Sequence, residues 1–378
     1  MTVYRAPSAP GGWAAQRVSR RLPDFPWDRL APYAEAAAAH PGGVVDLSVG
    51  TPVDPTPETV QRALRAASDA PGYPWTAGTA ALRTAAAGWL SRRLGVHADP
   101  RAVLPTIGSK EVVAWLPTLL GLGPGDQVVV PELAYPTYDV GARLAGAEPV
   151  ATDGLLRLGP APVRLVWLNS PSNPTGRVLP ADHVRKVVAW ARDRGAVVAS
   201  DECYIELSWG GAPVSVLHPE VCGGAHDGLL ALHSLSKRSN LAGYRAAFLT
   251  GDPVLVGELL EVRRHAGMMV PGPVQAAMVA ALDDDTHAAE QRERYLNRRT
   301  TLRRALEAAG FRVDDSEAGL YLWATRGEPC EQTLSWLAER GILVAPGDFY
   351  GPAGGHHVRV ALTTTDERLA AAAARLAA

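Results

Sequence analysis

Chemistry is concentrated in the segment Ser234-Leu-Ser-Lys-Arg, which directly follows an apolar run and is soon followed by Arg245. Lys237 carries a primary amine that can attack an aldehyde, which the permanently protonated guanidinium of arginine cannot do. Ser234, Ser236 and Arg245 supply donors of the kind that bind phosphate. The segment could therefore hold a phosphorylated aldehyde by one covalent bond and one anionic group. An ordinary polar loop is the alternative interpretation.

Two earlier apolar runs also end in polar side chains. One is followed by Asn173-Pro-Thr-Gly, and the other ends in Asp201-Glu-Cys-Tyr204. A pyridine cofactor needs a carboxylate at its ring nitrogen and donors at its ring oxygen, and these residues offer both. Each motif has a plain alternative, since Asn-Pro-Thr-Gly is also a turn and a buried aspartate can cap a helix. Together with Lys237 they favour a site for pyridoxal phosphate.

These motifs must be positioned by an α/β core. Short runs rich in Val, Leu and Ala alternate with helical patterns, as expected for strands buried on both faces of a parallel sheet. Ligands bind at the carboxyl ends of such strands, where the polar motifs stand. Strands are predicted at 102–106, 127–130, 164–169, 196–201, 229–234 and 246–250, with helices at 111–121 and 181–194 among them.

The pattern changes after Pro271. A long charged helix is predicted at 286–309, strands at 320–324 and 358–362, and an Ala-rich helix at the end. We therefore expect a large cofactor-binding domain at 48–277 and a small α+β domain at 278–378. The Pro- and Gly-rich segment 1–47 is expected to pack on the small domain or on a partner subunit.

The composition excludes several classes of protein. The formal net charge is -2 over 378 residues, so no basic field attracts nucleic acid. Three cysteines at irregular spacing indicate neither a disulfide framework nor a metal site. No stretch is apolar enough for a secretory signal or a membrane span, which predicts a cytoplasmic protein without a membrane partner.

The order and spacing of these motifs resemble the fold type I aminotransferases, the aspartate aminotransferase superfamily. The resemblance implies a mostly parallel sheet with helices on both faces, a smaller α+β domain and a homodimer with shared active sites. It implies that Lys237 bonds covalently to the cofactor and that Asp201 pairs with the pyridine nitrogen. It further implies that Asn173 and Tyr204 contact the ring oxygen and that Ser234, Ser236 and Arg245 bind the phosphate.

The same resemblance assigns residues outside these motifs. Gly108, Ser109 and Lys110 join a strand to a helix, whose N-terminus is suited to an anion. Lys110 departs from the small residue common in this loop, and capping or simple exposure are its alternatives. Tyr135 is expected to stack on the pyridine, with core packing as the alternative. Tyr73 is expected to reach the phosphate of the neighbouring subunit.

Two further residues are expected to bind the substrate. Arg359 lies inside the apolar run 358–362, where a charge is costly without a partner. The resemblance implies that its guanidinium holds the substrate α-carboxylate, together with Asn173. Gly50 would let the substrate approach the backbone closely, although a turn glycine is also possible.

The predicted reaction is ping-pong amino transfer between an amino acid and 2-oxoglutarate, with no metal. Four segments, around Trp27, Gly50, Met268 and Gly347, resemble actinobacterial N-succinyldiaminopimelate aminotransferases of lysine biosynthesis. Such a substrate needs cations remote from Arg359, and the candidates are Arg20, Lys110, Arg263 and Arg264. Open alternatives are another aminotransferase of this class, a C-S lyase, and a non-catalytic relative or sensor domain.

Overall fold

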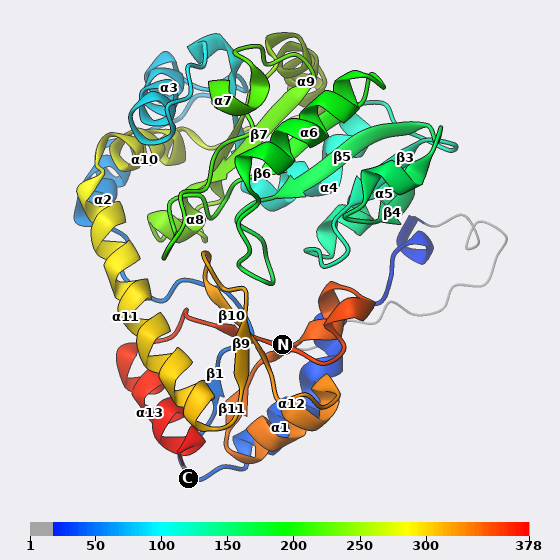
Figure 1. Ribbon diagram of the computed structural model, residues 1–378. Helices are drawn as coiled ribbons and strands as arrows, with labels where there is room; N and C mark the ends of the chain where they lie inside the picture. Colours follow the sequence, from blue (N-terminus) through cyan, green and yellow to red (C-terminus); the bar gives the residue numbers. More distant parts are fainter. Residues whose placement is uncertain (1–17, 378) are drawn as a thin grey trace, which may run out of the picture.

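The computed structural model describes residues 18–377 (Figure 1). A seven-stranded sheet forms its centre, in the order β2-β8-β7-β6-β5-β3-β4. β8 is antiparallel to both of its neighbours, whereas the pairs from β7 to β4 are parallel. The strands are β2 (Val103–Ile107), β3 (Gln127–Val130), β4 (Glu148–Ala151), β5 (Val163–Asn169), β6 (Val197–Asp201), β7 (Leu229–Ser234) and β8 (Ala246–Gly251).

Helices cover both faces of this sheet because the strand residues that point toward each face are apolar. In β5, Val166 belongs to one buried cluster, whereas Leu165 and Trp167 belong to the other. The first cluster packs against α2 (Glu58–Ala66), α3 (Ala80–Leu94), α6 (Ala181–Arg192), α7 (Pro219–Cys222) and α10 (Gly272–Asp283). The second packs against α4 (Ser109–Leu119), α5 (Thr137–Ala145) and α9 (Pro253–Ala266). The predicted α/β class is confirmed.

A third cluster surrounds a four-stranded antiparallel sheet of order β12-β13-β10-β9. Its strands are β9 (Arg312–Asp314), β10 (Tyr321–Thr325), β12 (Ala345–Pro346) and β13 (Val358–Ala361), and β1 (Val45–Asp46) pairs separately with β11 (Ile342–Leu343). The helices here are α1 (Ala31–Ala38), α11 (Thr286–Ala308), α12 (Cys330–Glu339) and α13 (Asp366–Leu376), and α11 runs along one side in Figure 1.

The predicted N-terminal segment contributes to this third cluster. Leu30, Val45 and Leu47 are buried in it, and α1 packs against α12. Residues 1–17 of that segment lie outside the described residues, and the domain boundaries at 47 and 277 stay a prediction. The remaining elements are the single turn α8 (Leu235–Arg238) and the 3-10 turns η2 (Val18–Arg21), η3 (Pro26–Leu30), η4 (Pro100–Ala102), η5 (Leu155–Leu158), η6 (Gly347–Tyr350) and η7 (Pro352–Gly354). Across residues 18–377, no helix combines the length and apolarity needed to cross a membrane.

Candidate active site

The carboxyl ends of three neighbouring strands bring the predicted motifs together. Asn169 at the end of β5 lies opposite Asp201 at the end of β6. The Asn169 amide nitrogen donates to the Asp201 carbonyl oxygen at 3.0 Å, and its side-chain oxygen accepts from the Asn173 N–H at 2.8 Å. One buried amide therefore fixes the position of Asn173 relative to Asp201. Sequence reasoning had assigned Asn169 no role.

Asp201 is a buried carboxyl group without a cationic side chain as partner among the described residues. Its oxygens accept from the Tyr138 hydroxyl at 3.0 Å and from the Cys203 N–H at 3.2 Å. Burial raises the pKa of Asp201, and the hydrogen bonds from Cys203 and Tyr138 oppose this rise. A cationic ligand would stabilise the ionised carboxylate here, and a protonated pyridine nitrogen is a group of this kind.

Lys237 lies in α8, immediately after β7, and its amine donates to the Gly50 carbonyl oxygen. Burial lowers the pKa of Lys237, an effect that Tyr321 and Cys203 oppose and that Arg359 and Arg245 strengthen. The neutral amine, which is the nucleophilic form, is therefore more populated than in an exposed lysine. The Cys203 thiol lies close enough to both Asp201 and Lys237 for each to shift its pKa.

The predicted phosphate-binding residues meet around the start of α4. Gly108 precedes the first residue of that helix, Ser109, and has φ +75°. A Cβ on Gly108 would lie 2.0 Å from an Arg245 guanidinium nitrogen, so only glycine allows the two to approach. Arg245 donates to the Ala242 carbonyl oxygen and forms no ion pair with a described residue. Free N–H groups at a helix start and a nearby cation suit a phosphate.

Ser234 and Ser236 stand where β7 passes into α8, next to Lys237. Both are buried, and the Ser234 hydroxyl accepts from the Ser236 N–H at 3.2 Å. This turn fixes the direction in which Lys237 leaves the sheet. The residues present thus fit pyridoxal phosphate at three points: an amine for the aldehyde, a carboxylate for the ring nitrogen and a cationic helix start for the phosphate.

Arg359 is a buried cation without a carboxylate partner among the described residues. It is 2% exposed and lies in β13. Its nitrogens donate to the Asn173 side-chain oxygen at 2.9 Å and to the Ser48 carbonyl oxygen at 2.6 Å, and its Nε has no partner. An uncompensated buried guanidinium is costly. A carboxylate that enters with a substrate would remove this cost.

Two tyrosines connect Arg359 with the lysine. The Tyr204 and Tyr321 hydroxyls lie 3.3 Å apart, and the Arg359 guanidinium carbon is 3.8 Å from the centre of the Tyr321 ring. A Cβ on Gly50 would lie 2.1 Å from the Tyr321 hydroxyl oxygen. This contact gives a structural reason for glycine at this position, while a substrate role for Gly50 stays a prediction.

The residues predicted at the rim occupy different environments. Tyr135 is half-buried, with its ring perpendicular to that of Tyr138 at 6.0 Å. Lys110 is exposed, and its amine lies 5.9 Å from the centre of the Tyr135 ring. Tyr73 is 95% exposed and Trp75 is 75% exposed. Tyr73 therefore points away from the core of its own chain.

Two of the predicted distal cations are already paired within the chain. Arg263 is fully buried and binds Glu111 through two bonds, of 2.6 and 3.0 Å. This buried pair assigns the Arg263 guanidinium to the fold and argues against Arg263 as the cation that selects the substrate. Arg264 is 61% exposed and pairs with Glu261 at 3.0 Å. Arg20 is exposed in η2 and Lys110 at the start of α4, and neither forms an ion pair with a described residue.

Sequence reasoning missed Tyr138 and Tyr321. Tyr138 lies in the first turn of α5, three residues after Tyr135, which precedes the helix. A second tyrosine so close to Tyr135 could have suggested a second inward-facing aromatic ring. Tyr321 stands in an apolar strand, where an aromatic residue is indistinguishable from core packing until the opposing residues are known.

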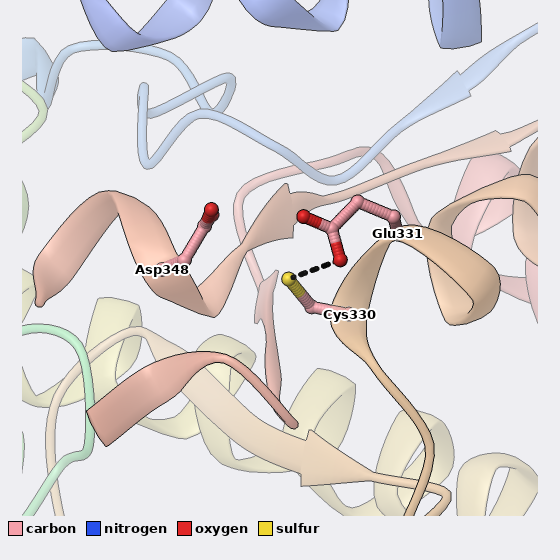
Figure 2. A group of neighbouring side chains, drawn as sticks. All are labelled: Cys330, Glu331 and Asp348. Carbon is pink, nitrogen blue, oxygen red and sulfur yellow. Dashed lines mark hydrogen bonds between the residues drawn. The ribbon is translucent and has the colours of Figure 1, made fainter. Parts of the chain in front are cut away.

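A separate group of potential metal ligands lies in the third cluster. Figure 2 shows Cys330, Glu331 and Asp348, with the Cys330 thiol donating to Glu331 at 3.5 Å. Burial raises the pKa of Cys330 to about 11, which keeps the thiol protonated near neutral pH. Arg29 pairs with Asp348 at 2.9 Å and with Glu331 at 3.7 Å. Because these charges are already neutralised within the chain, we assign no metal site to them.

Comparison with known proteins agrees with this geometry. Residues 42–376 match the family described as aminotransferase class I and II. The chain is 67% identical over 360 residues to a probable aminotransferase of Mycobacterium tuberculosis, covering 95% of this chain and 86% of that protein. It is 65% identical over 357 residues to the 4-dedimethylamino-4-oxo-anhydrotetracycline transaminase of Streptomyces rimosus, covering 94% and 99%.

A solved structure extends the likeness. A probable N-succinyldiaminopimelate aminotransferase of Thermus thermophilus has a TM-score of 0.83 and 29% identity, covering 93% of this chain and 99% of that one. Members of this family use pyridoxal phosphate, and their substrates are amino acids and 2-oxo acids. On the match over residues 42–376 and the two relatives above 60% identity, the chain belongs to the class I and II aminotransferases.

Proposed function

We propose that this aminotransferase acts on N-succinyl-LL-2,6-diaminopimelate, with the glutamate and 2-oxoglutarate pair as its second substrate. The observation that supports a reaction on amino acids is that a buried acid and a buried cation at the site both lack a partner of opposite charge among the described residues. Asp201 is a buried carboxyl group without a cation, and Arg359 is a buried cation without a carboxylate, among the described residues. A cationic cofactor ring and a substrate carboxylate would satisfy both.

Pyridoxal phosphate, when bound, supplies an aldehyde for covalent attachment and an aromatic ring that accepts electrons. In the proposal, Lys237 holds the aldehyde carbon, Asp201 keeps the ring nitrogen protonated and Arg245 binds the phosphate. Tyr138 restricts the orientation of Asp201 through its 3.0 Å hydrogen bond. Asn173 and Tyr204 direct donors at the ring oxygen.

Lys237 is proposed to carry the proton. Burial lowers the pKa of Lys237, so the neutral amine is more populated than in an exposed lysine. Once the substrate amino group has replaced Lys237 on the aldehyde carbon, the freed Lys237 amine would take the proton from the substrate α-carbon, and Arg359 would hold the neighbouring carboxylate in a fixed orientation. The same residues act in reverse on the incoming 2-oxo acid, which is the basis for ping-pong kinetics.

The succinyl group requires a cation or donor away from Arg359. Lys110 is the best supported candidate, since it is exposed at the start of α4, next to the residues proposed to bind the phosphate, and has no acidic partner among the described residues. Its neighbour Glu111 is neutralised by Arg263 instead. Selectivity for the succinylated form is therefore proposed to depend on Lys110.

A second candidate substrate class is a polycyclic ketone. It is favoured by the 65% identity to the Streptomyces rimosus transaminase, whose printed activity concerns 4-dedimethylamino-4-oxo-anhydrotetracycline. Such a ketone has no α-carboxylate for Arg359. In that case Arg359 would serve the amino donor alone.

The experiment compares amino donors for 2-oxoglutarate in the purified, cofactor-loaded enzyme, with glutamate formation as the measurement. We expect kcat/KM for N-succinyl-LL-2,6-diaminopimelate to exceed that for LL-2,6-diaminopimelate by at least about tenfold, or about 1.4 kcal/mol. Efficient amination of the tetracyclic ketone by glutamate, without turnover of the succinylated substrate, would favour the second candidate. Release of ammonia or thiol without a 2-oxo acid would indicate a lyase.

We also propose a homodimer in which Tyr73 completes the site of the partner subunit. The support is the 95% exposure of Tyr73 beside the 75% exposed Trp75, since large exposed aromatic residues mark interfaces. Tyr73→Ala and Lys237→Ala chains, mixed and reassembled, should recover activity that neither has alone. A monomer by light scattering, or mixtures no more active than their components, would contradict the shared site.

A further inference from the structure

Tyr321 contacts two of the groups to which the proposed function assigns roles, Tyr204 and Arg359, and it lies beside Gly50, whose carbonyl oxygen accepts from the Lys237 amine. It is the first residue of β10, it is buried, and it lies beside β13 with Ala361 opposite it. Its ring and its hydroxyl have different neighbours. The two parts of the side chain can therefore be separated by substitution.

The hydroxyl of Tyr321 lies where Lys237, Gly50 and Tyr204 meet. It is 3.3 Å from the Tyr204 hydroxyl and 2.1 Å from the position that a Cβ of Gly50 would take. The Lys237 amine donates to the carbonyl oxygen of that same Gly50. Because Gly50 has no side chain, the Tyr321 phenol has room to lie beside the residue that accepts from the Lys237 amine.

The ring of Tyr321 supports the guanidinium of Arg359. The guanidinium carbon lies 3.8 Å from the centre of the Tyr321 ring and 4.9 Å from the centre of the Tyr350 ring. The two terminal nitrogens of Arg359 donate to Asn173 and Ser48, and these hydrogen bonds fix the orientation of the guanidinium plane. Aromatic rings attract a guanidinium and restrict its rotation.

The electrostatics agree with this arrangement. Burial alone would raise the pKa of the Tyr321 phenol, but Arg359, Lys237 and the hydrogen bond with Tyr204 outweigh it and lower the pKa below its usual value. In return, Tyr321 opposes the lowering of the Lys237 pKa. The phenol and the amine therefore influence each other's protonation.

We infer that Tyr321 is a positioning residue with two separable functions: its hydroxyl sets the protonation and orientation of Lys237 and Tyr204, and its ring aligns Arg359 for the substrate carboxylate. This inference rests on the roles proposed above for Lys237 and Arg359. Gly50 belongs to the same arrangement, because any larger residue at this position would displace the Tyr321 phenol.

The variant Tyr321→Phe keeps the ring and removes the hydroxyl. We expect kcat to fall by about three- to tenfold, the effect of one hydrogen bond, with KM for both substrates unchanged. The variant Tyr321→Leu also removes the ring and should additionally raise KM for amino acid and 2-oxo acid by about three- to tenfold. KM should therefore stay at the wild-type value in Tyr321→Phe and rise in Tyr321→Leu. A purely structural role of Tyr321 would not predict this difference between the two variants.

A second readout uses the cofactor-free full chain and does not depend on turnover. The pH dependence of acetylation at Lys237, followed by mass spectrometry, reports the protonation of that amine. The exposed Lys186 in the same chain serves as internal standard. In Tyr321→Phe the midpoint at Lys237 should move down by about half to one pH unit, equivalent to three- to tenfold, while Lys186 stays unchanged.

The matched control is Tyr295→Phe. Tyr295 is also buried, and its ring lies 5.9 Å from the guanidinium carbon of Arg298, a residue to which the proposed function assigns no role. This variant should leave kcat, KM and the Lys237 midpoint unchanged. A Tyr321→Phe enzyme with an unchanged kcat and an unchanged midpoint would overturn the inference.

Failure of the proposed function gives a different result. If Lys237→Ala retained turnover and a borohydride-trapped adduct, the role of Lys237 itself would be wrong. If Lys237→Ala is inactive while Tyr321→Phe behaves as the wild type in both readouts, only the inference on Tyr321 fails.

Discussion

Replacing Arg263 with methionine tests whether this arginine supports the fold or selects the substrate. Arg263 on α9 is fully buried and binds both oxygens of Glu111, which is 14% exposed. Glu111 also accepts from the Ile107 N–H at 3.2 Å. The pair therefore clamps the loop that contains Gly108 and Ser109, where we propose the phosphate binds.

The expected cost follows from the burial of the pair. Methionine fills a similar volume but leaves the Glu111 carboxylate without its cation in a site almost closed to water. Removing one partner of a buried pair costs about 3–5 kcal/mol. We expect about 3 kcal/mol, since Glu111 keeps the Ile107 donor and some contact with water. At about 1.4 kcal/mol per tenfold change, the ratio of folded to unfolded protein falls by about two orders of magnitude.

The double variant Arg263→Met with Glu111→Gln separates lost charge balance from lost packing. The glutamine oxygen still accepts from Ile107, but no uncompensated charge is left. We expect it to recover about 2 kcal/mol of the free energy of unfolding. Arg264→Met is the matched control, because its exposed pair with Glu261 should contribute less than about 1 kcal/mol.

Urea unfolding at fixed protein and cofactor concentrations measures these differences. Steady-state kinetics on the same samples should show that KM for the succinylated substrate and KM for 2-oxoglutarate change by equal factors. The reasoning is refuted if Arg263→Met raises KM for the succinylated substrate alone while the free energy of unfolding stays at the wild-type value. Arg263 would then be a selectivity residue after all.

Further predictions concern the two proposed site residues and a buried acid. Lys237→Ala should abolish both turnover and the borohydride-trapped adduct, detected by mass spectrometry, and a surviving adduct would contradict the assignment. Arg359→Lys loses the guanidinium fork and its aromatic stacking, so KM for both amino acid and 2-oxo acid should rise at least about tenfold in steady-state assays; an unchanged KM would exclude Arg359 from carboxylate binding. Burial raises the pKa of Glu202 from 4.5 to about 7. The folded state therefore binds this proton more tightly, and its contribution to the free energy of unfolding, up to about 3 kcal/mol, is present at low pH and lost as pH rises from 4.5 through 7. Urea unfolding at several pH values should show this decline in the wild type and a flatter profile in Glu202→Gln.

Much of the framework was predictable because its signals are local. The apolar runs of β3 and β7 were predicted with the bounds that the structure shows, and α11 within one residue. Strands buried on both faces are uniformly apolar, and the polar residue that follows marks the end of each strand. The edge strand β4 was missed, because Glu148–Ala151 is covered on fewer sides and lacks this pattern.

The same signals placed Asn173, Asp201 and Lys237 on one edge of the sheet. Parallel strands end on the same side, so motifs that follow three such strands must converge. The sequence alone thus determined the fold class and the cofactor, and the family match supports both. It determined these from residue type and order, without any knowledge of side-chain contacts.

Only the tertiary structure decided which charges remain available. Arg263 and Glu111 are 152 residues apart, and Arg359 and Asn173 are 186 apart. Whether such distant groups meet depends on helix rotation and strand register, which many sequences with the same apolar pattern would satisfy differently. Packing therefore made Arg263 part of the fold, left Arg359 without a carboxylate, and set the Tyr321 phenol against a glycine beside Lys237.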